Sequence, residues 1–408
     1  MQMAGISDKS NFPLYNTVLM PQEEMLEVKK AGKKLTIGIP KEKSKFENRI
    51  ALTPQGIELL VENGHIVLFE SGAGEASNFS DRNFSECGAT IVQNNSEVFR
   101  AEVVLKISPF THEELDLLSP GQTIISLVQL HQQSRELIRK MMDKKVNAIA
   151  FELIKDAHDS YPISRSMSEI EGIASIMIAS EYLSKAHNGK GVLLGGITGV
   201  SPAEVIILGA GTAGESAARA ALGLGATVKV FDNSLKSLRE LELQVGQKVY
   251  TSVLYPKAVT KALKSADAVI ANLRYLQSGL SYMVTEEQVA QMKKGSILID
   301  LSMGQGGCFE SSICTDFAHP VFIKHGVIHY CVPNVASHVA RTASIALSNI
   351  FAPMLLQIAN AGNINTLIKE DNGFSHGLYV YKGILTNHYI GETFSLPSKD
   401  IGLLMAAF

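Results

Sequence analysis

The sequence predicts an α/β protein with two doubly wound, Rossmann-like domains, one inserted into the other. Short apolar runs typical of buried strands alternate with helical patterns in both halves of the chain, and such alternation indicates βαβ units with a largely parallel sheet. One of these strands, Val205 to Leu208, leads into a glycine-rich turn and a helix. A last strand or hairpin pattern, which starts at Gly377, is expected to return to the first domain.

Length and composition describe an ordinary globular protein. The chain has 408 residues, of which 46% are hydrophobic and 19% charged, so two or three domains with more than one core are expected. A net charge of −3 provides no field that would attract nucleic acid or an acidic membrane. The four cysteines form no Cys-x-x-Cys pair and indicate no disulfide scaffold, which fits a reducing cytosol.

Residues 1–34 form a mixed, polar N-terminal extension, in which residues 21–30 are expected to form a short helix. The extension lacks a basic start followed by an apolar core, so it is not a signal peptide. No stretch reaches the roughly 18 uninterrupted apolar residues of a membrane helix, because polar residues interrupt the best candidate at 345–361. We therefore expect a soluble, cytoplasmic protein with neither a membrane nor a nucleic-acid partner.

The first half begins with a strand at 34–40 and continues with a helix from Pro54 to about Asn63. Thr53 is a favourable N-cap for this helix, and proline is favourable at its first position. A strand at 65–70 follows the helix. Further strands are predicted at 101–107, 123–130 and 148–153, and further helices at 112–118 and 135–144.

A long helix over 168–185, apolar on much of its circumference, is predicted to bridge the two domains. The glycine-rich segment 189–199 contains no Gly-Lys-Ser or Gly-Lys-Thr, so we interpret it as a connector and not as a P-loop. A helix at 342–361 leads back to the first domain. The remaining elements of the second domain are helices at 237–244 and 285–292 and strands at 268–272, 296–301 and 327–332.

The glycine-rich turn has the form Gly-x-Gly-x-x-Gly, with Gly209, Gly211 and Gly214 at its fixed positions. These glycines allow a tight turn and close approach of the backbone to a pyrophosphate, whose charge the following helix N-terminus favours. The next strand ends at Asp232, roughly 20 residues beyond the glycines, where a carboxylate binds the adenosine ribose and repels a 2′-phosphate. The pattern therefore predicts NAD, in preference to NADP, as the cofactor.

Three candidate chemical groups lie at predicted strand ends: Arg49, Lys106 and His131. A guanidinium fork suits a substrate carboxylate, a lysine can polarise a carbonyl, and a histidine titrates near neutral pH. Each group also has a purely structural alternative. Arg49 could pair with Glu47, Lys106 could reach solvent, and His131 could be an ordinary residue at the end of a strand. No pattern of metal ligands accompanies them.

Several sequence blocks resemble the family of alanine dehydrogenases and the NAD-binding subunit of proton-translocating transhydrogenases. The blocks are Ile39-Pro40-Lys41-Glu42 with residues 47–54, Glu70-Ser-Gly-Ala-Gly74, Arg165-Ser-Met-Ser168, the glycine fingerprint, and Gly306-Gly307-Cys308-Phe309-Glu310. The resemblance runs from about Lys34 to Gly402, about nine tenths of the chain. It implies an NAD-binding domain at 166–339 inserted into a substrate domain at 35–165 and 340–408.

The resemblance also implies a reaction, the NAD-dependent oxidative deamination of L-alanine to pyruvate and ammonia, or its reverse with ammonium. By matched position, Arg49 and Lys106 would hold the carboxylate and the carbonyl of the keto acid, and His131 would act as acid and base. The presence of Lys106 and His131, and the missing membrane segment, favour the alanine dehydrogenase branch. The residues expected to contact the cofactor are Ser168, Asp232 and Asn334.

One position departs from the family pattern. In alanine dehydrogenases the strand ending at Asp300 is followed, four residues later, by a second aspartate, and this chain has Gly304 there. Deamination requires an activated water and proton transfer. The loss of this carboxylate could lower the rate, leave His131 to act alone or mark a different substrate. The loop at 272–281 also departs from the usual Gly/Pro-rich form.

Three functions therefore stay open: an alanine dehydrogenase, a dehydrogenase of another amino or keto acid, and a protein that binds NAD(H) without turnover of an amino acid. The resemblance further implies a homo-oligomer, either a hexamer or a dimer. The apolar helices at 168–185 and 342–361 could supply its contacts. Burial of both helices in the core of the chain itself explains their composition equally well.

Overall fold

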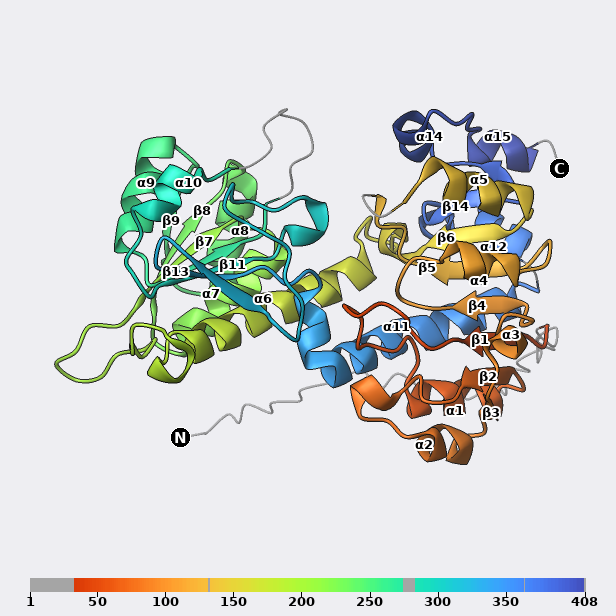
Figure 1. Cartoon of the computed structure of the whole chain (residues 1–408). Coiled ribbons are helices and arrows are strands. Elements are labelled where there is room, and N and C mark those ends of the chain that lie inside the picture. Colours follow the sequence, from red (N-terminus) through yellow and green to blue (C-terminus); the bar gives the residue numbers. More distant parts are fainter. Residues whose placement is uncertain (1–32, 131–132, 274–282, 363, 407–408) are drawn as a thin grey trace, which may run out of the picture.

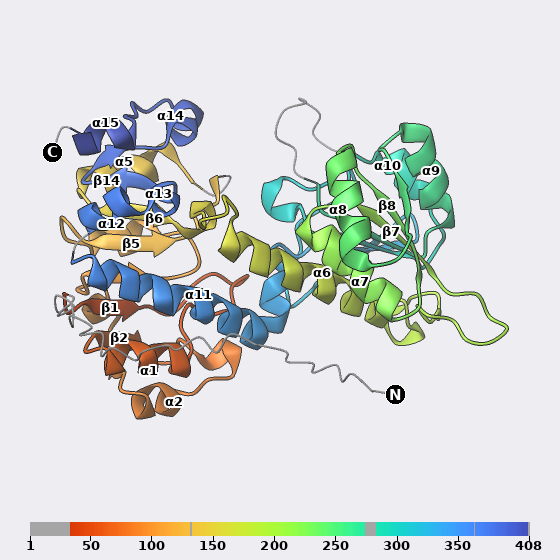
Figure 2. The same cartoon turned by 180° about the vertical axis from the view of Figure 1, so that it is seen from behind.

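Figure 1 shows the computed structural model of the chain, in which two α/β units are joined by two long helices, α6 (Pro162–Tyr182) and α11 (Ala340–Asn360). The view from behind in Figure 2 shows the same arrangement. The structure describes residues 33–130, 133–273, 283–362 and 364–406. The predicted helix at 21–30, His131 and most of the loop at 272–281 lie outside the described residues.

The first unit is built on an eight-stranded sheet with the order β15-β14-β6-β5-β4-β1-β2-β3. Strands β1 to β6 run parallel, whereas β14 is antiparallel to β6 and β15 antiparallel to β14. The strands are β1 (Thr36–Ile39), β2 (Ile66–Glu70), β3 (Thr90–Val92), β4 (Val103–Leu105), β5 (Thr123–Ser126), β6 (Asn147–Ala150), β14 (Leu378–Tyr381) and β15 (Ile384–Leu385).

Helices cover both faces of this sheet. Alternate residues of its strands therefore pack in two different hydrophobic cores, one on each face. Val104 packs in a core with α4 and α5, and its neighbour Leu105 packs in the other core with α1 and α11. The helices of this unit besides α11 are α1 (Pro54–Glu62), α2 (Asp81–Glu86), α3 (Asn95–Val98), α4 (His112–Asp116), α5 (Arg135–Asp143), α12 (Ile364–Glu370), α13 (Asn372–Ser375), α14 (His388–Phe394) and α15 (Ile401–Ala406).

The second unit has a seven-stranded sheet with the order β12-β13-β11-β10-β7-β8-β9. Only β12, at the edge, is antiparallel to its neighbour, and the other strands follow the doubly wound order of a dinucleotide-binding fold. The strands are β7 (Glu204–Leu208), β8 (Thr227–Phe231), β9 (Tyr250–Ser252), β10 (Ala268–Ala271), β11 (Ile297–Asp300), β12 (Val321–Lys324) and β13 (Val327–Tyr330).

This second sheet is also covered on both faces. Ile207 packs in a core with α6 and α7, and Ile206 packs in the opposite core with α9. The helices of this unit besides α6 are α7 (Thr212–Gly223), α8 (Leu235–Val245), α9 (Pro256–Ser265) and α10 (Glu286–Ala290). Because β14 and β15 return to the first sheet after all these elements, the second unit is inserted into the first, as the sequence predicts.

Several element limits differ from those predicted. The strand predicted at 123–130 ends at Ser126, and Gln129, with a φ of 40°, could not have belonged to a strand. The strand predicted at 148–153 ends at Ala150, and a 3₁₀ turn, η3 (Phe151–Leu153), follows it. The bridging helix begins six residues earlier than predicted, since Pro162 provides a favourable first helical position.

Thr53 precedes α1 in extended conformation, as an N-cap residue does, but its side chain makes no capping hydrogen bond. Its hydroxyl instead donates to Ser348 Oγ of α11 at 3.1 Å, and its backbone nitrogen donates to the same oxygen at 3.0 Å. The start of α1 is thus attached to α11 across a sequence separation of 295 residues. A tertiary contact has replaced the local cap.

The segment Val335–Asn360, which includes α11, is long and apolar enough to cross a membrane by length and composition alone. Its most apolar window is 56% buried in the protein. Leu347, Phe351 and Leu355 lie in the core of the first unit, where the Phe351 ring packs edge-on against Phe151 with ring centres 5.0 Å apart. Burial in this core accounts for the hydropathy of α11.

The close crossing of α6 and α7 depends on Gly172. A Cβ atom added there would press on the Ala213 carbonyl and lie 2.9 Å from the Ala217 nitrogen of α7. We predict that Gly172→Val lowers the free energy of unfolding by roughly 1–3 kcal/mol, because overpacking forces the backbones apart. Thermal unfolding measures the change. Gly223→Ala, at an open position at the end of α7, is the matched control and should leave the melting temperature nearly unchanged.

Candidate active site

The glycine turn follows β7 and leads into α7. A Cβ at Gly209, which has a φ of 110°, would press on the backbone of Asn272, and a Cβ at Gly214 would press on the Gly209 carbonyl. Both positions therefore require glycine for steric reasons. Gly211, which caps α7, faces open space instead, with no atom of the described residues within 4 Å of a Cβ placed there. The open position beside a helix N-terminus fits the diphosphate of a dinucleotide.

Asp232 lies just after β8 and is hydrogen-bonded to the glycine turn. Its Oδ2 accepts from the Ala210 nitrogen at 2.7 Å, and its Oδ1 accepts from the Ser234 nitrogen at 2.7 Å. The carboxylate thus connects the turn after β7 to the start of α8. It occupies the edge of the sheet where the ribose of a dinucleotide binds in this fold.

Arg49 is buried and paired with Glu47. Its Nε and Nη2 donate to Glu47 Oε1 and Oε2, each at 2.7 Å, and its Nη1 contacts the Met167 sulfur of α6 at 3.3 Å. Arg49 is only 5% exposed. The structure therefore contains the Arg49–Glu47 pair that the sequence left open as an alternative.

Asn334 connects the second unit to this ion pair. It follows β13 in a left-handed conformation with a φ of 66°, and its Nδ2 donates to Glu47 Oε2 at 2.9 Å and to the Phe46 carbonyl at 3.0 Å. Ser337 of η6 (Val335–Val339) donates to Glu47 Oε1 at 3.2 Å. Glu47 thus accepts hydrogen bonds from Arg49 on one unit and from residues that follow the other sheet.

Lys106 does not reach solvent, because it is 2% exposed and enclosed by acidic residues. Its Nζ donates to both carboxylate oxygens of Glu114, at 3.0 and 2.9 Å, and lies 3.9 Å from Glu42 Oε2. Glu42 in turn accepts from the Ile107 and Ser108 nitrogens, at 2.5 and 3.2 Å. Burial raises the pKa of the Glu42 carboxyl, and the charge of Lys106 opposes this effect.

Arg49 and Lys106 are brought together through Glu42, which interacts electrostatically with both. The two cations follow neighbouring strands, β1 and β4, at the carboxyl edge of the first sheet. His131, the third predicted group, lies outside the described residues, so its position relative to them stays a prediction. Ser168 lies on α6 next to Met167, the residue that contacts Arg49.

Glu152, in η3 just after β6, is an acidic residue that sequence reasoning missed. Its Oε1 accepts from the Val128 nitrogen at 2.7 Å, while its buried Oε2 has no hydrogen-bond partner among the described residues. Burial raises the pKa of this carboxyl to about 7, although backbone hydrogen bonds oppose the shift. A charged residue inside the predicted strand at 148–153 was the signal that could have identified it.

Asp300 fixes the loop that carries Gly304. Its Oδ2 accepts from the Cys308 nitrogen and from Ser312 Oγ, both at 2.7 Å, and its Oδ1 accepts from the Ser302 nitrogen at 2.9 Å. Gly304 lies in η5 (Met303–Gln305), and among the residues that the structure describes no atom lies within 4 Å of a Cβ placed on it. The loop is therefore well anchored and has room for a side chain that this sequence lacks.

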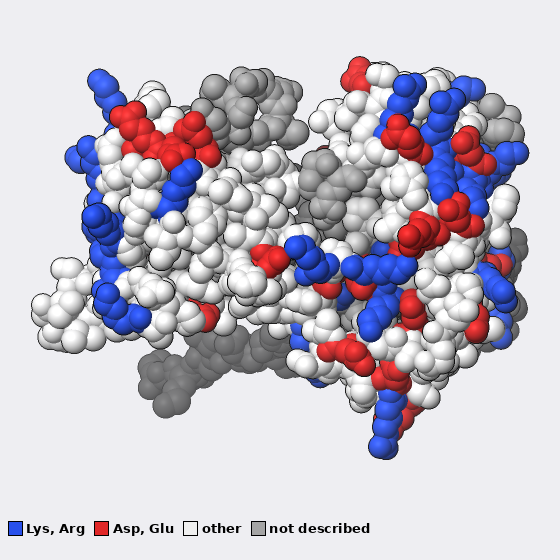
Figure 3. Space-filling model, in the orientation of Figure 1, with Lys and Arg blue, Asp and Glu red and all other residues white. Residues whose placement is uncertain are grey.

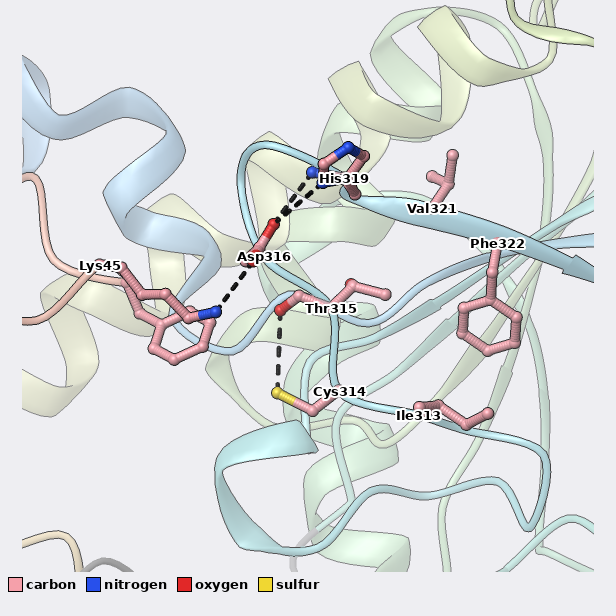
Figure 4. A pocket seen from close by; sticks show the side chains of 9 residues that line it. Lys45, Ile313, Cys314, Thr315, Asp316, His319, Val321 and Phe322 are labelled. Carbon is pink, nitrogen blue, oxygen red and sulfur yellow. Dashed lines mark hydrogen bonds and ion pairs between the residues drawn. The ribbon is translucent and has the colours of Figure 1, made fainter.

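The two units also meet at a shallow pocket of about 440 Å³. Lys45 reaches it from the first unit and pairs with Asp316 of the second unit at 3.0 Å, as Figure 4 shows. Phe46 and Phe322 supply apolar walls. Acidic and basic side chains intermix over both units on the face shown in Figure 3, in agreement with the nearly balanced net charge of −3.

These features define a class, a two-domain α/β dinucleotide-binding protein with charged groups at the carboxyl edges of both sheets. Comparison with known proteins is more specific. Residues 38–171 match the family described as alanine dehydrogenase/PNT, N-terminal domain, and residues 175–388 match alanine dehydrogenase/PNT, C-terminal domain. The chain belongs to the alanine dehydrogenase/PNT family, as its sequence motifs indicated.

Individual relatives agree with this assignment. The chain is 37% identical to alanine dehydrogenase 2 of Staphylococcus aureus strain USA300 over 368 residues, which cover 90% of this chain and 98% of the relative. A solved L-alanine dehydrogenase superposes with a TM-score of 0.82 at 33% identity, over 88% of this chain and 99% of that one. A transhydrogenase from Sinorhizobium meliloti, at 22% identity and a TM-score of 0.71, covers 86% and 98% and shares the fold.

The raised pKa of Glu152 predicts a pH-dependent stability. The protonated carboxyl suits its buried site, so its contribution to folding is fully present at acidic pH and is lost as pH rises from its ordinary pKa to about 7. We predict that Glu152→Gln melts at a higher temperature than the native chain at pH 8. The difference between the two melting temperatures should be smaller at pH 5. Thermal unfolding at both pH values measures it. For Glu62→Gln, at an exposed position, the difference in melting temperature from the native chain should be the same at both pH values.

Proposed function

We propose that the protein is an NAD-dependent alanine dehydrogenase that converts L-alanine to pyruvate and ammonia and catalyses the reverse reductive amination. The observation that carries this proposal is the continuous likeness to alanine dehydrogenases, in sequence and in fold, across both units of the chain. Bound NAD supplies the hydride acceptor for the substrate α-carbon. The residues of this chain must bind and orient both ligands and exchange protons with the substrate nitrogen and oxygen.

The cofactor is assigned to the carboxyl edge of the second sheet. Gly209 and Gly214 permit the tight turn, Gly211 is proposed to leave room for the diphosphate, and Asp232 is proposed to accept hydrogen bonds from the ribose, which its place beside the glycine turn supports. Ser168 and Asn334 are proposed to contact the cofactor from α6 and from the start of η6. The hydrogen bonds of Asn334 to Glu47 and to the Phe46 carbonyl support this role, because they hold its amide between the two units.

The substrate is assigned to the carboxyl edge of the first sheet, with Arg49 as the partner of its carboxylate. Glu47 occupies the Nε and Nη2 edge of the guanidinium, and Nη1 points to a thioether, a weak acceptor that a carboxylate would replace favourably. Lys106 is proposed to polarise the keto-acid carbonyl, which requires it to exchange part of its contact with Glu114. His131 is proposed to act as the acid and base.

The domain limits and the assembly complete the proposal. We assign residues 35–165 and 340–408 to the substrate domain and 166–339 to the NAD-binding domain, and we place the protein in the cytoplasm as a hexamer or dimer. The return of β14 and β15 to the first sheet supports the discontinuous substrate domain. The ligands are L-alanine or pyruvate, ammonium and NAD, and no nucleic-acid or membrane partner is invoked.

A second candidate function, binding of NAD(H) without turnover of an amino acid, is favoured by two observations. Gly304 provides no carboxylate where the family has aspartate, although the loop has room for one. In addition, Arg49 and Lys106 are each held by a carboxylate of the chain itself, Glu47 and Glu114 respectively. A dehydrogenase of another amino or keto acid would share this geometry and differ only in the substrate that it turns over.

The proposal is tested by the initial rate of NADH oxidation with pyruvate and ammonium. We expect turnover by the native chain. Arg49→Lys, which keeps the charge but loses the planar fork, should raise the KM for pyruvate about 10- to 100-fold, as expected for about 1.5–3 kcal/mol of charged hydrogen bonding. The dissociation constant of NADH, titrated by fluorescence, should stay unchanged. Arg82→Lys, at an exposed position of α2, is the matched control.

The variant Gly304→Asp distinguishes an alanine dehydrogenase from a protein that binds NAD(H) without turnover. If the native chain binds NADH but shows no turnover, and Gly304→Asp gains turnover while Gly304→Asn does not, the native protein is a cofactor-binding relative without the chemistry. Because the Cβ of residue 304 meets no neighbour within 4 Å in the described part of the chain, both variants should fold normally. Silence of all three proteins with pyruvate, together with turnover of another keto acid, would identify a different substrate.

Cofactor choice depends on Asp232. We predict that Asp232→Asn, which still accepts the hydrogen bond from the Ala210 nitrogen, reduces the preference for NADH over NADPH at least 10-fold, because the charge that repels a 2′-phosphate is removed. Fluorescence titrations with both nucleotides measure the ratio. An unchanged ratio would show that another group of the protein sets the preference.

A further inference from the structure

Glu152 and Gln133 each have a buried side-chain oxygen without a hydrogen-bond partner. Among the described residues, the buried side-chain atoms left without a partner are Glu152 Oε2, Gln133 Oε1 and Tyr330 Oη. Tyr330 ends β13 of the second unit, whereas Glu152 in η3 and Gln133, just before α5, belong to the first. An unpaired buried acceptor costs free energy, so a ligand that donates hydrogen bonds to these oxygens is favoured.

Both side chains are attached to the backbone of Val128, beyond the end of β5. Glu152 Oε1 accepts from the Val128 nitrogen at 2.7 Å, and Gln133 Nε2 donates to the Val128 carbonyl at 2.6 Å. The second bond fixes the orientation of the Gln133 amide, because only its nitrogen can donate to a carbonyl. Its remaining oxygen is therefore an acceptor, and so is Glu152 Oε2 when the carboxyl is ionised.

This pair of acceptors borders the site assigned to the substrate. The sheet order β6-β5-β4-β1 places Glu152 and Lys106 after strands that only β5 separates, at the same carboxyl edge. Helix α6 provides a second connection. Ser164 Oγ donates to the Glu152 carbonyl at 3.2 Å, and Met167, three residues further along, contacts Arg49. Three residues correspond to about 4.5 Å along a helix.

The charge of Glu152 has no counterpart in the described part of the chain. Arg49 and Lys106 each have a carboxylate partner, whereas Glu152 is bonded to backbone nitrogen. Burial, and to a smaller extent the charge of Glu152, raises the pKa of the Tyr379 hydroxyl on β14, so this neighbour stays neutral. An ionised Glu152 is thus a buried negative charge that a small cation would compensate.

We propose that Glu152 and Gln133 form a subsite for ammonium, the nitrogen substrate of the reductive amination. Ammonium carries a positive charge and only N–H donors, so it matches a carboxylate and an amide oxygen that lack partners. The cations assigned to the keto acid, Arg49 and Lys106, would instead repel it. This inference rests on the proposed function, because it locates one of the substrates. It also supplies a carboxylate to a site in which Gly304 supplies none.

Steady-state kinetics of the reductive amination test the subsite. Glu152→Gln keeps an oxygen for the Val128 nitrogen but removes the negative charge. We expect the KM for ammonium to rise at least about 10-fold, while the KM for pyruvate and the dissociation constant of NADH change less than about twofold. Gln133→Met, which removes the second acceptor, should raise the KM for ammonium about threefold or more.

Glu62→Gln and Gln55→Met, at exposed positions of α1, are the matched controls and should leave both KM values unchanged. A purely structural role of Glu152 predicts a different pattern, in which the KM values for ammonium and pyruvate change together or not at all. Either of these results overturns the proposal.

Thermal unfolding provides a readout that needs no turnover. At pH 8 with NADH present, ammonium chloride should raise the melting temperature of the native chain more than equal concentrations of sodium chloride or tetramethylammonium chloride, whose cations have no N–H donor. Glu152→Gln should lose this difference. Equal shifts with all three salts, or an ammonium shift that Glu152→Gln retains, overturn the subsite.

The subsite and the proposed function fail in different ways. A native chain without turnover of pyruvate and ammonium, whose ammonium-specific melting shift still depends on Glu152, refutes the alanine dehydrogenase and retains the ammonium subsite. A native chain that turns over, with a KM for ammonium that Glu152→Gln leaves unchanged, refutes only the subsite.

Discussion

The buried ion pair of Arg49 and Glu47 is the interaction on which the arrangement of the candidate site depends. Glu47 accepts two side-chain hydrogen bonds and one backbone hydrogen bond from Arg49, and further bonds from Asn334 and Ser337, so one carboxylate joins the loop after β1 to the segment after β13. Removal of one partner from such a pair leaves an uncompensated buried charge, which costs several kcal/mol (about 3–5). The pair therefore sets both the position of the guanidinium and the contact between the two units.

A second buried network, around Lys106, also pairs a buried cation with carboxylates of the chain itself. Glu114 compensates the ammonium directly, and Glu42 holds the start of the following loop through two backbone nitrogens. Each cation proposed to bind substrate is thus stabilised by a carboxylate of the chain itself when no ligand is present. Under the proposed function, a substrate carboxylate would add to the free edge of Arg49 beside Glu47, and the charge of Arg49 would then be shared between two carboxylates.

Helix α6 connects these features with the rest of the molecule. It passes from the first unit to the second, packs closely on α7 at Gly172 and contacts Arg49 through Met167. One helix thereby links the NAD-binding unit to Arg49, the residue proposed to bind the substrate carboxylate.

The sequence by itself determined the alternation of strands and helices, the glycine turn and the acidic residue after β8, because periodicity and turn chemistry depend on neighbouring residues. Only the tertiary structure decided which groups the buried polar side chains contact. The hydroxyl of Thr53 binds Ser348 and not the helix that it precedes, Lys106 is enclosed by Glu114, and Glu152 approaches Val128 across the sheet. The Thr53 and Glu152 contacts join segments that are distant in the sequence and meet only when helices and strands pack together. The Lys106 contact joins residues eight apart, but the turn between them becomes buried only in the folded unit.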